Sequence, residues 1–410
     1  MSPSLSFDAS LDLPCGARVK NRFLKSAMSE QLGDRRHDPS PGLCTLYRTW
    51  AEGGAGVLVT GNVMIDGTAL GEPNNVVLDE RSDLSSFARW AEAGRENDTQ
   101  HWMQLNHPGR QVPSFLSKEP VAPSAIPLGG SLKRAFNTPR ALSDEEIQSI
   151  VDKFARAAEL AQQVGFTGVQ IHGAHGYLVS QFLSPLQNVR TDRWGGSAEN
   201  RRRFVLAVYD AIRARVGAAF PVSIKLNSAD FQRGGFEEDE SMQVFDALVA
   251  RGIDLVEVSG GNYEAPVMAG VGAKQSTRSR EAYFLDYAEK VRSRARVPLA
   301  VTGGFRSGPV MLDALTRGAT DMIGLARPLA ICPDLPLRLL RDPNEALSLP
   351  PPRTGIKLVD RVTMLDVTYY EAQLARMAAG REPRADLSPW SAVFQTLGRF
   401  GVYAFRPRRA

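Results

Sequence analysis

Several features that would mark other classes of protein are scarce or missing in this 410-residue chain. The three cysteines, Cys15, Cys44 and Cys332, lie far apart and form no Cys-x-x-Cys pair. This spacing argues against a structural zinc site, an iron–sulfur cluster and a disulfide framework, and it fits a reducing, cytoplasmic setting. The sequence has no uninterrupted run of about 18 apolar residues and no basic N-terminal region followed by an apolar stretch. We therefore expect neither a membrane-spanning helix nor a signal peptide.

An excess of charge of either sign is also missing from most of the chain. The 49 Lys and Arg residues nearly balance the 45 Asp and Glu residues, and the hydrophobic share of 43% is that of a globular protein. From Arg353 to the C-terminus, ten basic residues stand against five acidic ones, so the small net charge of +4 belongs to this tail. A nucleic-acid-binding body would need its own basic face, so we expect no nucleic-acid partner.

What the sequence does contain is one alternation that is repeated eight times. Apolar runs rich in Val, Ile and Leu are each followed by a segment with helical spacing, most clearly after Ser143 and over 197–216, 237–251 and 281–296. The runs cover residues 22–28, 56–62, 101–106, 168–172, 222–227, 255–259, 299–303 and 322–326. Several lack alternation with polar residues, which is typical of parallel strands covered on both faces. The pattern predicts an α/β fold with a closed (βα)₈ barrel. A doubly wound open sheet is disfavoured because no Gly-x-Gly-x-x-Gly follows the first run.

The domain boundary is indicated by the proline run that ends at Pro352. We predict a barrel over residues 1–345 and a basic C-terminal helical extension over 346–410, with helices over 359–379 and 388–405. The extension combines aromatic residues with arginines. It could pack on the barrel, contact a second subunit in a homo-oligomer, or lie on an anionic membrane surface.

The segment 107–142 is too long and too rich in proline for an ordinary connection between a strand and a helix. A long loop at the C-terminal end of a barrel strand usually shapes the active site, so we expect this segment to cover it. A mobile excursion on the surface is the alternative.

Histidines are concentrated where the predicted strands end. Three of the five in the chain, His107, His172 and His175, occupy such positions, which is where (βα)₈ enzymes keep their catalytic residues. Two imidazoles three residues apart can donate hydrogen bonds to one oxygen, and the phenol of Tyr177, with an ordinary pKa of about 10, can deliver a proton. A metal site, or histidines that are simply satisfied in the core, would also explain the pair.

Two glycines and an arginine near the end of the repeats form a candidate phosphate site. Gly303-Gly304 follow the seventh run and Ala326-Arg327 follow the eighth. In barrels the loops after strands seven and eight commonly bind phosphate through backbone N–H groups, and Arg327 would add a charged contact.

Two further polar residues stand at the barrel mouth. Lys225 would direct a cation toward it, although a structural salt bridge with Asp230 or Glu257 explains this lysine equally well. Gln104 offers an amide donor and acceptor, which suits a ring system that presents both.

One long stretch carries a specific set of motifs. These are residues 165–178, 181–185, 190–193, 195–197 and 200–201. The stretch resembles the signature of the Old Yellow Enzyme family of flavin-dependent ene-reductases, and weaker similarity extends from residue 21 to about 333. The resemblance is to the single-domain type, because the chain has no cysteine-clustered iron–sulfur segment.

The resemblance implies a non-covalent FMN in the barrel mouth, with NADH or NADPH as reductant. The residues that it implies for cofactor contact are Ser26, Ala27, Met28, Ser29, Asn62, Gln104, Lys225, Gly303, Gly304, Ala326 and Arg327. The substrate would be an α,β-unsaturated carbonyl compound. His172 and His175 would bind its oxygen, and Tyr177 would give a proton to its α-carbon.

The resemblance leaves two rival functions open. One is a metal-dependent aldolase or hydrolase built around His172 and His175, and the other is a non-catalytic flavin-binding protein. The loop residues Leu32, Phe231 and Tyr263 would shape the substrate pocket.

Overall fold

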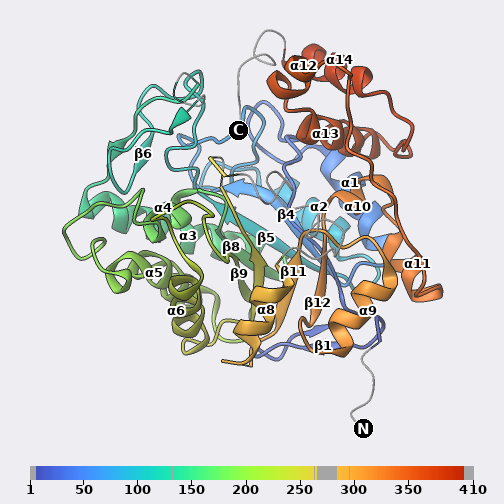
Figure 1. Ribbon diagram of the computed structural model, residues 1–410, viewed down its shortest axis with the longest axis horizontal. Coiled ribbons are helices and arrows are strands. Elements are labelled where there is room, and N and C mark those ends of the chain that lie inside the picture. Colours follow the sequence, from blue (N-terminus) through green and yellow to red (C-terminus); the bar gives the residue numbers. More distant parts are fainter. Residues whose placement is uncertain are drawn as a thin grey trace.

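A closed parallel barrel is the centre of the molecule (Figure 1). The computed structural model describes residues 6–130, 133, 135–262, 264–265, 284–294 and 296–400. The barrel strands, in chain order, are β3 (Phe23–Lys25), β4 (Val57–Met64), β5 (Gln100–Asn106), β8 (Gly168–Gly173), β9 (Val222–Asn227), β10 (Leu255–Ser259), β11 (Leu299–Thr302) and β12 (Met322–Leu325). Each overlaps one predicted apolar run, and β12 pairs with β3 to close the ring. The prediction of a (βα)₈ barrel is confirmed.

Helices surround the barrel as its outer layer. They are α1 (Pro41–Glu52), α2 (Leu84–Arg95), α3 (Asp144–Gln163), α4 (Leu178–Leu183), α5 (Ala198–Val216), α6 (Glu238–Val249), α8 (Leu285–Arg292), α9 (Gly308–Thr316), α10 (Arg327–Ile331) and α11 (Leu335–Arg341). α3 begins where the sequence predicts, because Ser143 and Glu146 form a reciprocal capping box. The helix predicted over 281–296 is described only from Leu285 to Arg292, and residues 281–283 lie outside the described part.

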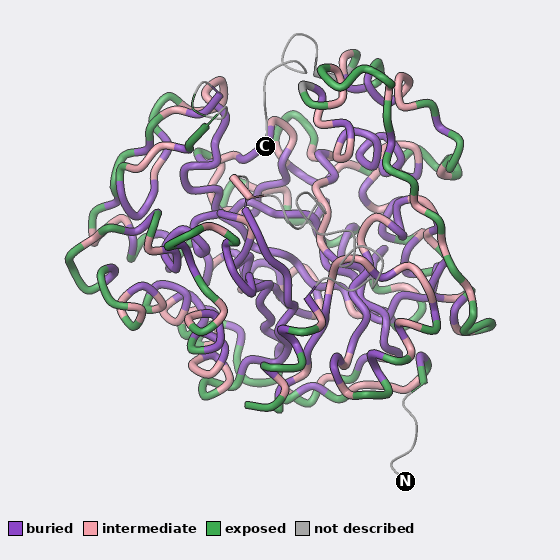
Figure 2. The backbone as a smooth tube through the Cα atoms, viewed as in Figure 1, coloured by how far each residue is buried: buried purple, intermediate pink, exposed green. Residues whose placement is uncertain are grey.

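The barrel is closed at its N-terminal end by a small hairpin. Strands β1 (Leu11–Asp12) and β2 (Arg18–Val19) pair in antiparallel fashion. Leu13 and Val19 pack with the inward-facing Leu24, Val57 and Trp102. The buried backbone at the centre of Figure 2 is this packed interior together with the interface between strands and helices. Enzymes with this barrel keep their active sites at the opposite, C-terminal mouth.

The proline-rich segment 107–142 lies against the predicted site. It contains the short parallel pair β6 (Val121–Ala122) and β7 (Arg140–Ala141). Leu128, Ala135 and Phe136 form a buried apolar cluster with Tyr177. The segment thus covers a predicted catalytic residue, as expected.

The described part of the C-terminal extension packs on the barrel's helical layer. Its helices are α12 (Lys357–Val362), α13 (Leu365–Ala378) and α14 (Pro389–Phe400), and α13 contacts α1 and α10 (Figure 1). The segment predicted to be helical over 359–379 forms two helices, because Met364 adopts a left-handed backbone with φ 51° and separates α12 from α13. Residues 401–410, which include the last five residues of the second predicted helix, lie outside the described residues. No helix in the described chain is long and apolar enough to cross a membrane.

Candidate functional site

Strand register pairs predicted site residues across neighbouring strands. Asn62 on β4 is the pairing partner of Gln104 on β5, and His172 on β8 is the partner of Lys225 on β9. All four side chains are buried, with exposed fractions of 9% or less. The positions that the sequence places at strand ends are therefore neighbours in space.

The three predicted catalytic residues lie in contact. The ring of His172 is centred 5.2 Å from that of His175 and 4.7 Å from that of Tyr177. His175 and Gly176 both adopt left-handed backbone, with φ of 62° and 77°. This tight turn folds the chain back at the end of β8 and presents the imidazoles and the phenol to one another. The His175 Nε2 atom lies 2.8 Å from the Ser259 hydroxyl of β10, which fixes the ring.

Glu257 is the centre of a buried polar cluster that the sequence did not reveal as a site residue. Its carboxylate accepts hydrogen bonds of 2.6 Å from both Ser26 and Thr302, and it lies 3.0 Å from the Lys225 ammonium. Burial raises the pKa of Glu257, but Lys225 and the two hydroxyls reverse this effect, and the pKa lies below its ordinary value. Glu257 is thus an anion at neutral pH. The salt-bridge interpretation of Lys225 is correct, with Glu257 rather than Asp230 as the partner.

The same cluster reaches Gln104 through one intermediate side chain. Gln170 donates to Glu257 at 2.9 Å and accepts from the Gln104 amide at 2.8 Å. Both are polar residues inside apolar strands: Gln170 lies between a Val and an Ile, and Glu257 lies between two Val residues. That interruption of an apolar run is the signal that could have found them.

A second buried ion pair supports the loop that follows β3. Lys25 Nζ lies 3.3 Å from Glu30 and 3.0 Å from the Tyr47 hydroxyl, and Tyr47 donates to Glu30 at 2.5 Å. Burial lowers the pKa of Lys25 to about 8, against the opposing effect of the Glu30 carboxylate. Glu30 also accepts from the backbone N–H of Gly61 on β4, so the loop is anchored inside the barrel.

The predicted flavin loop, residues 26–29, is held along its length. Ser26 donates to Glu257, Met28 packs on the main core, and Ser29 donates to the buried carboxylate of Glu72. Ala27 lines the cavity described next.

A cavity of about 160 Å³ opens beside this loop. Gly303 and Gly304 have φ of 124° and 99°, a region that side-chain-bearing residues rarely adopt, so these two positions require glycine. Seven predicted site residues line the cavity: Ala27, His175, Lys225, Gly303, Gly304, Ala326 and Arg327. The other predicted residues lie elsewhere around the mouth: Ser26, Met28, Ser29, Asn62, Gln104, His172 and Tyr177.

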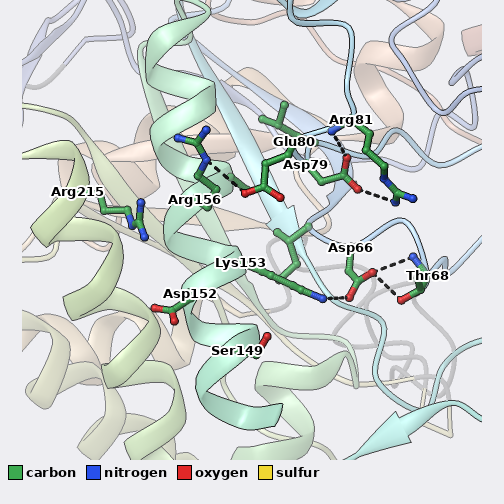
Figure 3. A pocket seen from close by; sticks show the side chains of 13 residues that line it. Asp66, Thr68, Asp79, Glu80, Arg81, Ser149, Asp152, Lys153, Arg156 and Arg215 are labelled. Carbon is green, nitrogen blue, oxygen red and sulfur yellow. Dashed lines mark hydrogen bonds and ion pairs between the residues drawn. The ribbon is translucent and has the colours of Figure 1, made fainter. Parts of the chain in front are cut away.

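Two cavities beside helix α3 are larger than this one, and neither is lined by a predicted catalytic or cofactor residue. The first, of about 720 Å³, lies between the chain after β4 and helix α3 (Figure 3). Several of its charges pair with one another, as in Lys153 with Asp66 at 2.5 Å and Arg81 with Asp79 at 2.9 Å. These charges already have partners without a ligand.

The second of these cavities, of about 400 Å³, is lined by His107. The Nδ1 atom of His107 accepts the backbone N–H of Gly109 at 3.1 Å, and burial lowers the pKa of His107 to about 4. His107 is therefore a neutral residue that shapes the start of the long loop. The sequence predicted it beside His172 and His175, but it lines a different cavity from His175.

The remaining sequence expectations concern pocket shape and metals. Leu32 packs on the main core, and Phe231 is 49% exposed, while Tyr263 lies outside the described residues. Within the described part of the chain, no group of three or more His, Cys, Asp or Glu side chains is placed to hold a metal ion. The metal-dependent alternative has no ligand set there.

Comparison with known proteins decides the family. A model of the NADH:flavin oxidoreductase / NADH oxidase family matches residues 15–345. The chain belongs to this family, that of Old Yellow Enzyme. This flavin oxidoreductase is 39% identical over 349 residues to an NADH-dependent flavin oxidoreductase of Hypocrea jecorina, covering 80% of this chain and 86% of the relative. It is 41% identical over 337 residues to another of the same description from Aspergillus parasiticus, covering 78% and 75%.

Solved structures share the barrel of this flavin oxidoreductase. A 2-naphthoyl-CoA reductase complex has a TM-score of 0.76 at 26% identity, over 82% of this chain and 52% of that one. Morphinone reductase has a TM-score of 0.70 at 24% identity, over 86% of this chain and 93% of that one. At that identity, morphinone reductase supports the fold alone.

The family uses FMN, with NADH or NADPH as reductant, and the site of this chain fits that cofactor. An isoalloxazine ring presents amide-like donors and acceptors, for which Gln104 and the Lys225 cation are suitable partners. A phosphate needs N–H donors and positive charge, which the left-handed glycines and Arg327 provide. The cavity connects the two ends, because Lys225 and Arg327 both line it. The predictions of an oxidoreductase, of FMN and of the family are confirmed.

Proposed function

We propose that this flavin oxidoreductase reduces the carbon–carbon double bond of α,β-unsaturated carbonyl compounds, with NADH or NADPH as the electron source. The observation that carries the proposal is the buried contact of His172 with both His175 and Tyr177 at the end of β8. Two hydrogen-bond donors beside one proton donor are what conjugate reduction of a carbonyl compound requires. Several similar relatives are named NADH-dependent, which supports NADH as the first reductant to test.

The cofactor contacts in this proposal are those that the family resemblance implies. Bound FMN supplies hydride transfer, from the nicotinamide and then to the β-carbon of the substrate. The residues assigned to hold it are Ser26, Ala27, Met28, Ser29, Asn62, Gln104, Lys225, Gly303, Gly304, Ala326 and Arg327. Glu257 supports this assignment, because it orients Lys225 directly and Gln104 through Gln170.

The protein side chains polarise the substrate and complete the addition. The imidazoles of His172 and His175 donate hydrogen bonds to the carbonyl oxygen, which draws electrons from the double bond and makes the β-carbon electrophilic. As hydride adds to the β-carbon, the Tyr177 hydroxyl gives its proton to the α-carbon. The double bond thereby gains two hydrogens, and solvent restores the proton of the phenol.

Substrate access is shaped by the segment 107–142. Leu128 and Phe136 cover Tyr177 with apolar surface, and Tyr177 is only 4% exposed. Exclusion of water strengthens the hydrogen bonds to the carbonyl oxygen and protects the site from side reactions.

Anaerobic reoxidation tests the proposal. The FMN-loaded chain is reduced with NADH and mixed with 2-cyclohexenone, and the flavin absorbance and the product are followed. We expect the flavin band to return as cyclohexanone forms. A protein that NADH reduces, but that only oxygen reoxidises, would be a flavin oxidoreductase of another kind.

A further inference from the structure

We propose that the C-terminal extension completes the FMN site, with Leu349 forming part of the wall at the phosphate end and Glu371 holding the flavin loop in place. The inference rests on the proposed FMN contacts of residues 26–29 and Arg327. It gives a function to a part of the chain that begins where the family match ends, at residue 345.

The extension reaches the site along the loop that follows β11. Backbone hydrogen bonds join Gly308 to Glu345 at 2.8 Å and Leu347 to Arg306 at 2.9 Å. These bonds lead the chain from α11 back to the barrel mouth, just after Gly303-Gly304. Leu349 therefore lines the same cavity as Arg327 and the two glycines.

Helix α13 continues the contact beyond Leu349. It packs against α10, whose first residue is Arg327, and lies beside α1 (Figure 1). Tyr370 of α13 is 7% exposed. Burial raises its pKa, and the positive charges of Arg327 and Arg306 act in the opposite direction. The extension thus places a buried aromatic residue close to the cations at the phosphate end.

Glu371, the residue after Tyr370 in α13, bonds to the chain that follows the flavin loop. Its carboxylate accepts a 2.8 Å hydrogen bond from the Gln31 amide, and both side chains are buried. Gln31 has a left-handed φ of 50°, a conformation that tertiary contacts must maintain in a residue other than glycine. Because Gln31 is two residues from Ser29, this bond fixes the loop opposite the anchors that Glu257 and Glu30 provide within the barrel.

Helix α13 also packs closely against α1. A Cβ atom added to Gly42 in α1 would lie 3.2 Å from the Cβ of Ala378, so the two helices approach closely at that point. The chain runs from the flavin loop through Gln31 to α1. Helix α13 contacts both ends of this segment, Gln31 through Glu371 and α1 through packing.

The first test compares three variants of the full chain by FMN titration of the apoprotein, followed through flavin fluorescence. Glu371→Leu removes the acceptor for Gln31, and we expect FMN to bind about tenfold more weakly. Glu371→Gln keeps an oxygen acceptor, and affinity should return to within about threefold of the wild type. Gln373→Leu is the matched control. Gln373 is buried on the same helix but bonds to the backbone of Arg384, within the extension.

The second test separates the phosphate end from the ring. Leu349→Asp places a carboxylate beside the proposed phosphate position. It should weaken FMN about tenfold or more while leaving riboflavin, which has no phosphate, within about twofold. Far-ultraviolet circular dichroism and the unfolding midpoint verify that each variant is folded.

The outcomes are distinct. Wild-type affinity in Glu371→Leu, equal weakening by Gln373→Leu, or equal loss of FMN and riboflavin in Leu349→Asp would each overturn the inference. If the wild-type chain itself binds no FMN, the proposed function fails instead.

Discussion

Tyr177 is the residue on which the proposed chemistry depends most. Its phenol is buried against His172 and the apolar residues of the long loop. We expect Tyr177→Phe to leave the reduction of bound flavin by NADH within about twofold, and to slow reoxidation by an enone about 10²- to 10⁴-fold, the usual contribution of a general acid. Stopped-flow absorbance of the two half-reactions measures both rates.

The control for this substitution is Tyr209→Phe, which removes a phenol that bonds to the backbone of Arg251 in the outer helical layer. It should change neither half-reaction. Equal slowing of both half-reactions in Tyr177→Phe would show that Tyr177 supports the fold or the flavin rather than the proton transfer.

Glu257 is the anion that neutralises the buried Lys225 ammonium inside the barrel. Replacing it by Gln leaves the Lys225 ammonium buried without its anion, so we expect the free energy of unfolding to fall by about 3–5 kcal/mol at pH 7. The double variant Glu257→Gln/Lys225→Met removes both charges and should recover a large part of that loss. Urea unfolding of the single and double variants measures the coupling. No recovery would mean that the ion pair is not the source of the effect.

At the scale of elements, Arg110 holds the long loop over the site. Its guanidinium donates to the carbonyls of Ile126 and Pro127 at 3.2 and 2.9 Å and pairs with Glu264 at 2.6 Å. Arg110→Met leaves a partly buried carboxylate without its cation, so we expect the loop to open and chymotrypsin to cleave within 107–142 about tenfold faster or more. KM for the enone should also rise in this variant, because the opened loop no longer shapes the substrate site.

Arg140→Met, at the end of the same loop, is the comparison. Arg140 pairs with Glu146 at the surface, where its side chain is 43% exposed, and such a pair contributes little. Cleavage of this variant should stay at the wild-type rate. A wild-type rate for Arg110→Met as well would show that the loop does not depend on the buried guanidinium.

A second contact between elements makes the stability of the fold depend on pH. Lys153 of α3 binds Asp66, which follows β4, at 2.5 Å (Figure 3). Burial raises the pKa of Asp66, but hydrogen bonds from Lys153 and Thr68 outweigh it and lower the pKa to about 2. A folded-state pKa below the unfolded value stabilises the fold above about pH 4, and this stabilisation is lost as the pH falls toward 2.

We therefore expect Asp66→Asn to lower the free energy of unfolding by about 1–2 kcal/mol at pH 7, a value reduced for solvent screening. Near pH 2 the variant and the wild type should be equally stable. Urea unfolding at the two pH values tests this, and a constant difference across the pH range would contradict it.

For the whole molecule, the barrel could be read from the sequence because its strands are buried on both faces, and several of them appear as apolar runs such as Met322–Leu325. Helix α3 was predictable from its capping box. The break at Met364 was not, because a left-handed residue in an apolar helical pattern has no local signal there. His172, His175 and Tyr177 could be placed together because they are close in sequence.

What could not be predicted depends on contacts between distant segments. Glu257 bonds Ser26 across the barrel, and Gln31 bonds Glu371 across 340 positions of the chain. Such pairs are set by strand register and by the docking of α13, which the order of residues along the chain does not show. For the same reason, the extension could be assigned no single contact from sequence alone.

The position of transferred hydrogen in the product tests the proposed reaction most directly. An enone is reduced once with NADH that carries deuterium on the transferable C4 position, in ordinary water, and once with unlabelled NADH in D₂O. We expect the nicotinamide deuterium at the β-carbon and the solvent deuterium at the α-carbon, with the carbonyl intact. Deuterium from NADH at the carbonyl carbon, or at the α-carbon, would contradict hydride addition at the β-carbon with proton donation by Tyr177.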